Sequence, residues 1–285
     1  MKYAVSAGGL CFSYGSKKVL DLPELKIAAN TMTSVTGPDG AGKSTLLSLI
    51  AGVREMQSGK LQVLGCDIRE ELCRRRLIPQ IAYMPQGLGK NLYFSLTVEE
   101  NLLFFASLFG YDRRESRRRI ENLTAATGLY PFLDRCAGRL SGGMKQKLGL
   151  CCALIHDPEL LILDEPATGV DPLARQQFRE LLASLREKNP QISIIVSTAS
   201  LDEAARFSRT ILMNKGKILF SGPPARLLEE TGAPDYETAF TVMLPEEKSP
   251  AAALPGTFVP AGKNSSVVIN ARHLTKKFEI GRAHV

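Results

Sequence analysis

Two stretches of this 285-residue chain combine side chains that bind phosphate and divalent metal ions in proteins. The first, Gly37-Pro-Asp-Gly-Ala-Gly-Lys-Ser44, fits the spacing G-x-x-x-x-G-K-[ST]. Glycines let the backbone turn its N–H groups toward a phosphate. Lys43 can then reach the β- and γ-phosphates of a nucleotide, and Ser44 can offer its hydroxyl to Mg²⁺. A glycine-rich loop without a chemical role is the alternative, which the full match to the spacing disfavours.

The second stretch, Leu160-Leu-Ile-Leu-Asp-Glu165, places two acids directly after four apolar residues. Such a run is typical of a parallel strand that is buried on both faces. Because α/β sheets bind ligands at the carboxyl ends of their strands, we expect Asp164 to hold Mg²⁺. Glu165 is expected to orient or deprotonate an attacking water. Taken alone, the pair could also be a solvated cap at the end of the strand.

A third stretch, Leu140-Ser-Gly-Gly-Met144, precedes apolar residues at helical spacing. Small residues at the start of a helix leave N–H groups free, and the helix dipole attracts negative charge there. The pattern therefore predicts a second anion site, with an ordinary helix N-cap as the alternative.

The elements that must position these residues alternate between short β-rich runs and helical stretches, which predicts an α/β fold. Thr97 and Glu100 form a capping-box pair that marks the start of a helix. We expect strands at 33–35, 81–84, 160–163 and 192–197, a hairpin over 210–221 that turns at 215–216, and helices over 43–51, 96–128 and 224–230.

Together these stretches resemble the nucleotide-binding domain of ATP-binding cassette (ABC) transporters. The resemblance covers about residues 1–235 and rests on Gly37–Ser44, Gln86 in Tyr83-Met-Pro-Gln86, Leu140–Met144, the pair Asp164/Glu165 and Gly169-Val-Asp-Pro172, in the family's order and spacing. The local sequences are most similar to tandem-domain ATPases of ABC-2-type multidrug exporters. The resemblance implies an α/β P-loop NTPase of ABC type, with a mainly parallel core sheet, an antiparallel β subdomain and an α-helical signature subdomain at about 87–150.

The resemblance also implies ATP and Mg²⁺ as ligands and assigns individual residues to them. Glu165, Gln86 and Lys43 are expected to be catalytic, and Ser44, Gln86 and Asp164 to hold the metal. The nucleotide is expected to contact Tyr14, whose ring would stack on adenine, together with Gly37, Pro38, Asp39, Gly40, Ala41, Gly42, Lys43, Ser44 and Thr45. ATP held by a second domain is expected to contact the signature residues Leu140, Ser141, Gly142, Gly143 and Met144, with Asp171 in the adjoining D-loop.

One position departs from the family pattern. A histidine that contacts the γ-phosphate usually follows the strand that carries Val196-Ser-Thr198, and Ala199 stands there instead. Alanine can neither donate to phosphate nor position water, so we expect a slow or degenerate ATP site that still binds ATP. Hydrolysis is expected to be faster where the phosphate loop of a second domain meets Ser141–Gly143.

The chain is expected to contain more than one domain. An ABC domain over 1–240 would be followed by a Pro/Ala-rich linker over 241–266. Residues 267–278 parallel Ala4–Tyr14 when Leu274 is set on Leu10, so we expect 267–279 to begin a truncated second ABC domain, with a chance match as the alternative. Residues 280–285 match what a common sequencing adapter encodes, and we expect the natural chain to continue past Glu279.

Composition restricts the class of protein and its location. A hydrophobic fraction of 44% and a charged fraction of 23% exclude a disordered or collagen-like chain. Because we find neither a signal peptide nor an apolar run of about 18 residues, we expect a cytoplasmic subunit, peripheral on the inner face of the cell membrane. It would power efflux through separate ABC-2-type permease subunits. The segment Gly87–Leu96 would contact these subunits through Leu92, Tyr93 and Phe94, or these three residues would be ordinary packing of the helical subdomain.

Cysteines and charge add two further expectations. Six cysteines without a C-x-x-C pair predict free thiols and neither disulfides nor a zinc site. A net charge of +7 suits a nucleotide, anionic lipid or nucleic acid, although solvated helix faces explain the arginine runs at 74–76 and 113–119 more simply.

Three functions remain open from the sequence. The first is the motor subunit of an exporter, and the second is a regulatory module that dimerises with nucleotide. The third is a soluble ABC protein of translation or DNA repair, which the short Pro/Ala-rich linker disfavours, so no nucleic acid is expected. The chain contains no motif that indicates the transported substrate.

Overall fold

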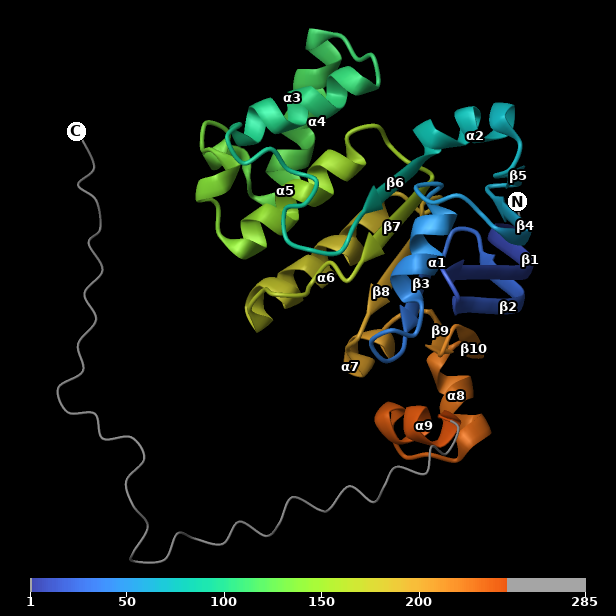
Figure 1. Cartoon of the computed structure of the whole chain (residues 1–285). Coiled ribbons are helices and arrows are strands. Elements are labelled where there is room, and N and C mark those ends of the chain that lie inside the picture. The colour runs from blue at the N-terminus through green and yellow to red at the C-terminus, as the bar shows by residue number, and fades with distance from the viewer. Residues whose placement is uncertain (1, 245–285) are drawn as a thin grey trace, which may run out of the picture. The chain divides into compact units, whose positions relative to one another are not determined.

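Two β-sheets and several groups of helices build residues 2–244, which are the residues that the computed structural model describes (Figure 1). The predicted repeat at 267–279 and the segment 280–285 lie outside the described residues, as does most of the predicted linker. The helix α9 (Tyr236–Met243) extends into the range predicted as linker, so residues 241–243 are helical.

The core sheet has six strands in the order β10-β9-β3-β8-β7-β6. All neighbours pair in parallel except β9 and β10, which form the predicted hairpin. The strands are β3 (Met32–Thr36), β6 (Ile81–Met84), β7 (Leu160–Asp164), β8 (Ser193–Thr198), β9 (Arg209–Asn214) and β10 (Lys217–Gly222). Because the strands run in parallel, the phosphate loop after β3 and the acids at the end of β7 emerge at the same edge.

Alternate residues of β7 pack on opposite faces of this sheet, which explains why the whole strand is apolar. Leu160 and Ile162 contact the cluster that includes helix α1 (Lys43–Ile50). Leu161 and Leu163 contact the cluster that includes Phe178 of helix α6 (Pro172–Lys188). The strand is therefore buried between helices on both faces, and its carboxyl end is held rigidly.

A second, antiparallel sheet has the strand order β2-β1-β4-β5. Its strands are β1 (Tyr3–Tyr14), β2 (Lys17–Ala28), β4 (Ser58–Val63) and β5 (Cys66–Asp67). Tyr14 pairs with Lys17 at the turn between β1 and β2. This sheet was expected from the family resemblance, and it places Tyr14 beside the phosphate loop, with the hydroxyl oxygen of Tyr14 3.5 Å from that of Thr45.

Helices α3 (Val98–Leu108), α4 (Arg113–Thr127) and α5 (Gly142–Leu154) form the helical subdomain. The stretch expected to be helical over 96–128 is two helices, because Gly110 adopts a φ of 73° and Asp112 then caps α4. The predicted capping box of Thr97 and Glu100 is confirmed at the start of α3. The remaining helices are α2 (Glu71–Leu77), α7 (Leu201–Ala204) and α8 (Pro224–Thr231).

The prediction of free thiols is wrong for one pair of cysteines. Cys66 in β5 and Cys73 in α2 form a disulfide, with their Cα atoms 5.6 Å apart. The chain turns from β5 into α2 within seven residues, which brings the two side chains together without a C-x-x-C spacing. The other four cysteines, Cys11, Cys136, Cys151 and Cys152, are free as expected.

Gly59 provides a test of how β4 supports β1. A Cβ atom at Gly59 would lie 2.3 Å from the carbonyl oxygen of Gly9 in β1, and φ is +90°. Gly52 also has a positive φ of +69° but faces open space. We expect Gly52→Ala to cost about 1–2 kcal/mol, and Gly59→Ala to cost about 1–3 kcal/mol more because it also clashes with the backbone. Chemical denaturation measures both free energies of unfolding, and equal losses would contradict this packing.

Candidate nucleotide site

The phosphate loop, residues 37–44, connects β3 to α1 through glycines with positive φ angles. Gly37 has a φ of +153°, and a Cβ atom there would lie 2.1 Å from the carbonyl oxygen of Met213 in β9. Only glycine fits such a close approach of two backbones. The loop is therefore held against the core sheet at its first residue.

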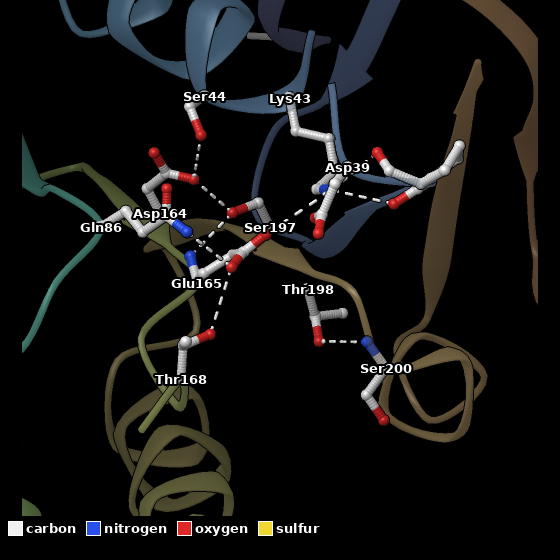
Figure 2. Close-up of polar contacts among 12 residues, drawn as sticks. Asp39, Lys43, Ser44, Gln86, Asp164, Glu165, Thr168, Ser197, Thr198 and Ser200 are labelled. Atoms are coloured by element: carbon white, nitrogen blue, oxygen red, sulfur yellow. Dashed lines mark hydrogen bonds and ion pairs between the residues drawn. The ribbon is translucent and has the colours of Figure 1, made fainter. Parts of the chain in front are cut away.

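Lys43 keeps its ammonium group inside the loop, where the side chain is 5% exposed. Its Nζ donates to the carbonyl oxygens of Gly37 at 2.9 Å and Pro38 at 3.2 Å. The same nitrogen lies 3.5 Å from Oε1 of Glu165 (Figure 2). The carboxylate of the exposed Asp39 is 4.0 Å away. A buried cation is thus stabilised by carbonyl dipoles and two carboxylates, an arrangement that can accept an anionic phosphate.

Asp164 ends β7 and is almost fully buried. Its Oδ1 accepts hydrogen bonds from the hydroxyl of Ser44 at 3.1 Å and from that of Ser197 at 2.6 Å (Figure 2). Burial raises the pKa of the Asp164 carboxyl, and the hydrogen bonds from Ser197 and Ser44 act in the opposite direction. Oxygen atoms from β7 and α1 therefore meet at one point, as a site for a hard cation requires.

Glu165 follows in a left-handed conformation with a φ of 45°, which is uncommon for a residue with a side chain. Its carboxylate accepts from Nε2 of Gln86 at 2.8 Å and from the hydroxyl of Thr168 at 3.2 Å. Its backbone N–H donates to Oγ of Ser197 at 2.7 Å. These three contacts offset the backbone strain and aim the carboxylate toward Lys43 (Figure 2).

An open cavity of about 980 Å³ collects these side chains. It is lined by the residues of the loop from Asp39 to Thr45 and by Tyr14, Lys17, Lys18, Val19, Gln86, Glu165, Thr168 and Lys215. The Tyr14 side chain is half-exposed, and the guanidinium of Arg54 lies 4.9 Å from the centre of its ring. An aromatic ring at one end of a lysine-rich cavity suits a base attached to a polyphosphate.

The signature residues lie elsewhere in the described part of the chain, because none of Leu140–Met144 lines this cavity. Ser141 caps α5 by accepting a hydrogen bond from the N–H of Met144 at 3.3 Å, and Leu140 is buried. Asp171 caps α6 in the same way, accepting from the N–H of Ala174 at 2.9 Å. The ordinary N-cap is therefore present, and a nucleotide contact at this helix start would have to come from another domain.

Ala199 is exposed at the end of β8 and lines a smaller cavity of about 120 Å³ together with Glu165. Among residues 2–244 the one histidine is His156, whose ring stacks on Phe109 with ring centres 3.9 Å apart. Its Nε2 lies 3.2 Å from the carbonyl oxygen of Ile81, at the start of β6. His156 is thus committed to packing on the helical subdomain, and the position next to Glu165 holds only a methyl group.

The segment after Gln86 is divided between core and surface. Leu92 is buried in the core of the helical subdomain, whereas Tyr93 and Phe94 are half-exposed. The buried amide of Asn101 fixes this segment by accepting from the N–H of Tyr93 at 2.9 Å and donating to its carbonyl oxygen at 3.0 Å. The expectation that Leu92 offers a surface contact is therefore wrong, and ordinary packing accounts for this residue.

Ser197 and Thr168 belong to the site although the sequence reasoning did not select them. Ser197 is opposite Asp164 in the register of β7 and β8, so its hydroxyl reaches the carboxylate directly. The apolar run at 192–196 followed by Ser197 could have indicated this, because adjacent parallel strands end side by side. Thr168 is three residues after Glu165, at a spacing typical of a turn.

Comparisons with known proteins agree with this geometry. The model of the ABC transporter family matches residues 20–168. A multidrug ABC transporter ATP-binding protein, YbhF of Escherichia coli, is 41% identical over 71% of this chain, and the match spans 34% of that relative. The Nod factor export ATP-binding protein I of a Rhizobium strain is 37% identical over 80% of this chain and 74% of its own length. The chain thus covers about a third of YbhF and most of the Nod factor protein.

Solved structures give the same result for the fold. The structure of cbiO1 from Clostridium perfringens, described as part of the ABC transporter complex cbiONQ, superposes with a TM-score of 0.73 at 26% identity. The match covers 81% of this chain and 92% of cbiO1. An ATP-binding subunit of an ABC transporter superposes with a TM-score of 0.72 at 27% identity, over 84% of this chain and 99% of that structure.

Removal of the Ser197 hydroxyl tests whether this side chain organises the two acids. We expect Ser197→Ala to weaken Mg-ATP binding or turnover, because Asp164 loses a hydrogen bond and the N–H of Glu165 loses its acceptor. The cost in unfolding free energy should be about 1–3 kcal/mol. Ser193→Ala is the matched control. It removes a buried hydroxyl from the same strand, and this hydroxyl accepts a hydrogen bond from the N–H of Asn30, away from the two acids. Calorimetry with Mg-ATP should separate the two variants, and equal effects would refute the assignment.

Proposed function

The chain belongs to the ABC transporter family of ATP-binding proteins. We propose that it hydrolyses ATP to drive an ABC-2-type exporter. The observation that carries the proposal is that Lys43, Ser44, Gln86 and Glu165 line one cavity, with the buried carboxylate of Asp164 hydrogen-bonded to Ser44. Two relatives, the multidrug ABC transporter ATP-binding protein YbhF and the Nod factor export ATP-binding protein I, support export over import. None of the helices within residues 2–244 is both long and apolar enough to span a bilayer. We therefore propose that ABC-2-type permease subunits form the membrane part, with this chain bound at the inner face of the membrane.

The loop and its surroundings suit the steps of ATP hydrolysis. The triphosphate would lie on the N–H groups of the loop, and Lys43 would exchange the carbonyl oxygens of Gly37 and Pro38 for phosphate oxygens. A water oxygen attacks the γ-phosphorus while the bond to the bridging oxygen breaks, and Glu165 accepts the proton of that water. Gln86, which donates to Glu165, would orient the same water. Tyr14 is proposed to stack on the adenine.

Ser44, Asp164 and Gln86 fit a Mg²⁺ ion by the chemistry of their donors. The hydroxyl of Ser44 and the carboxylate of Asp164 lie within hydrogen-bonding distance of each other. The side-chain amide of Gln86 donates through its nitrogen to Glu165, so the amide oxygen of Gln86 is left for another partner. Magnesium prefers such oxygen ligands and usually retains several waters. When bound, it would neutralise charge on the phosphates.

A complete site is proposed to need a second ABC domain. The signature helix start at Ser141–Gly143 lies away from the cavity of its own chain, so we propose that it completes the ATP site of a partner domain. That domain would be either the second copy proposed to begin at 267–279, joined to the ABC domain through a linker that follows α9, or a second chain. Asp171, in the turn beside the signature, would lie in the same interface.

Ala199 favours one alternative within the same family, a module that dimerises with nucleotide but hydrolyses little of it. A methyl group cannot donate to a γ-phosphate, and loss of one such donor costs about 100- to 1000-fold in rate. The intact carboxylate of Glu165 supports turnover, since it accepts two hydrogen bonds and the backbone N–H of the same residue donates a third. We therefore propose a slow ATPase at this site and no nucleic-acid partner.

Two substitutions separate nucleotide binding from hydrolysis. Lys43→Ala should abolish measurable Mg-ATP binding by calorimetry, because it removes the buried cation of the loop. Glu165→Gln should retain binding and lower turnover by about 100-fold or more, since the amide cannot accept the proton. Lys60→Ala, at an exposed position of β4, is the control and should bind normally. Unimpaired binding by Lys43→Ala would contradict the proposed function.

A chain that carries both ABC domains tests the proposed asymmetry. Replacing the phosphate-loop lysine of the second domain by alanine should remove most of the steady-state ATPase activity, because that loop meets Ser141–Gly143 of this domain. Lys43→Ala in the same chain should remove a smaller share, because the site beside Ala199 is slow. The steady-state rates of the two variants give the comparison, and equal losses would count against asymmetry.

A further inference from the structure

We propose that Arg175 contacts the γ-phosphate at this site and in part replaces the side chain that Ala199 lacks, which sustains the slow turnover proposed above. The inference rests on the proposed ATPase function and adds one catalytic residue to it. Arg175 lies in the first turn of α6, shortly after Asp171.

The position of Arg175 is the first argument. Its side chain lines the cavity of about 120 Å³ that also contains Ala199, Glu165 and Thr168. Glu165 and Thr168 line the nucleotide cavity as well, so the two cavities adjoin at these residues. Figure 2 shows Thr168 and Thr198 on the side of Glu165 that faces away from Ser44. The cavity that Arg175 lines therefore adjoins the nucleotide cavity at Glu165 and Thr168.

The unsatisfied hydrogen-bonding capacity of Arg175 is the second argument. Its Nε atom is buried and has no hydrogen-bond partner among residues 2–244. The nearest carboxylate oxygen, Oε1 of Glu203, is 3.8 Å away. A guanidinium carries five N–H donors, and a buried donor without an acceptor is unfavourable until one arrives.

Glu203 can release Arg175 because it has other partners. Its Oε2 accepts from the hydroxyl of Thr198 at 2.8 Å, and its Oε1 accepts from Nη1 of Arg179 at 3.4 Å. Glu203 therefore remains paired if Arg175 turns toward the phosphate, and the strand end at Thr198 stays in place. Arg179 contacts the same carboxylate from the next turn of α6 but does not line the cavity, which makes it a matched control.

The chemistry of the guanidinium suits this position. A planar guanidinium can donate two parallel hydrogen bonds to phosphate oxygens and stays protonated throughout. During hydrolysis Glu165 takes the proton from the attacking water, and the electrons of the broken bond remain on the terminal oxygen of ADP. Arg175 transfers no proton, and its charge stabilises the negative charge that develops on the γ-phosphoryl oxygens.

A double-mutant cycle in the 285-residue chain tests the proposal. We expect Arg175→Gln to lower kcat by about tenfold or more, with the Kd for Mg-ATP changed by less than about twofold. Arg179→Gln should change kcat by less than about twofold, and Arg175→Lys should retain an intermediate rate because it keeps the charge. Thermal unfolding of each variant verifies that it folds.

The decisive comparison is Ala199→His in both backgrounds. If histidine and Arg175 act on the same phosphate group, Ala199→His should raise the rate about tenfold or more in the Arg175→Gln chain and by a clearly smaller factor in the unsubstituted chain. An equal factor in both backgrounds, or equal losses in Arg175→Gln and Arg179→Gln, would overturn the proposal, as would an unsubstituted chain that binds Mg-ATP without measurable turnover. Failure of the unsubstituted chain to bind Mg-ATP would instead refute the proposed ATPase function.

Discussion

The structure of the site depends on placing one buried cation, the ammonium of Lys43, next to two buried acids without losing stability. The loop carbonyls of Gly37 and Pro38 solvate the cation, and Glu165 lies 3.5 Å from it. Burial of charge is costly unless it is paired and hydrogen-bonded. The fixed ends of β3 and β7 supply this pairing, because both strands are buried on both faces and hold the loop and the acids at one edge of the sheet.

A single hydroxyl links the two acids. Ser197 donates to Asp164 and accepts from the N–H of Glu165, so β8 fixes the position of both residues although it carries neither. The left-handed backbone at Glu165 is retained because this contact and the hydrogen bonds from Gln86 and Thr168 all require it. The strain aims the carboxylate out of the sheet and toward the loop, where water can be activated.

The sequence predicted the parts of this arrangement that follow from local spacing. The phosphate loop, the buried strand before Asp164 and the capping box at Thr97 depend on neighbouring residues, and the family resemblance supplied the antiparallel sheet. The contacts of Ser197 depend on strand register, and the Cys66–Cys73 disulfide depends on a turn whose path no periodic pattern indicates. The resemblance left open whether Leu92 contacts a partner or packs in the core, because its burial depends on how Asn101 holds the segment.

In the proposed two-domain site, a small change at Ala199 would have consequences beyond one hydrogen bond. The cavity collects cations and acids from one chain, while the signature helix start faces away from it, so the γ-phosphate would be the only group that both halves share. Any donor that contacts the γ-phosphate would therefore respond both to hydrolysis and to the proposed closure of two domains. A guanidinium held loosely by Glu203, whose other partners stay in place, can follow the phosphate as it leaves. Because an arginine remains charged where a histidine titrates, such a site would respond to the phosphate itself and be insensitive to protonation of the contacting residue.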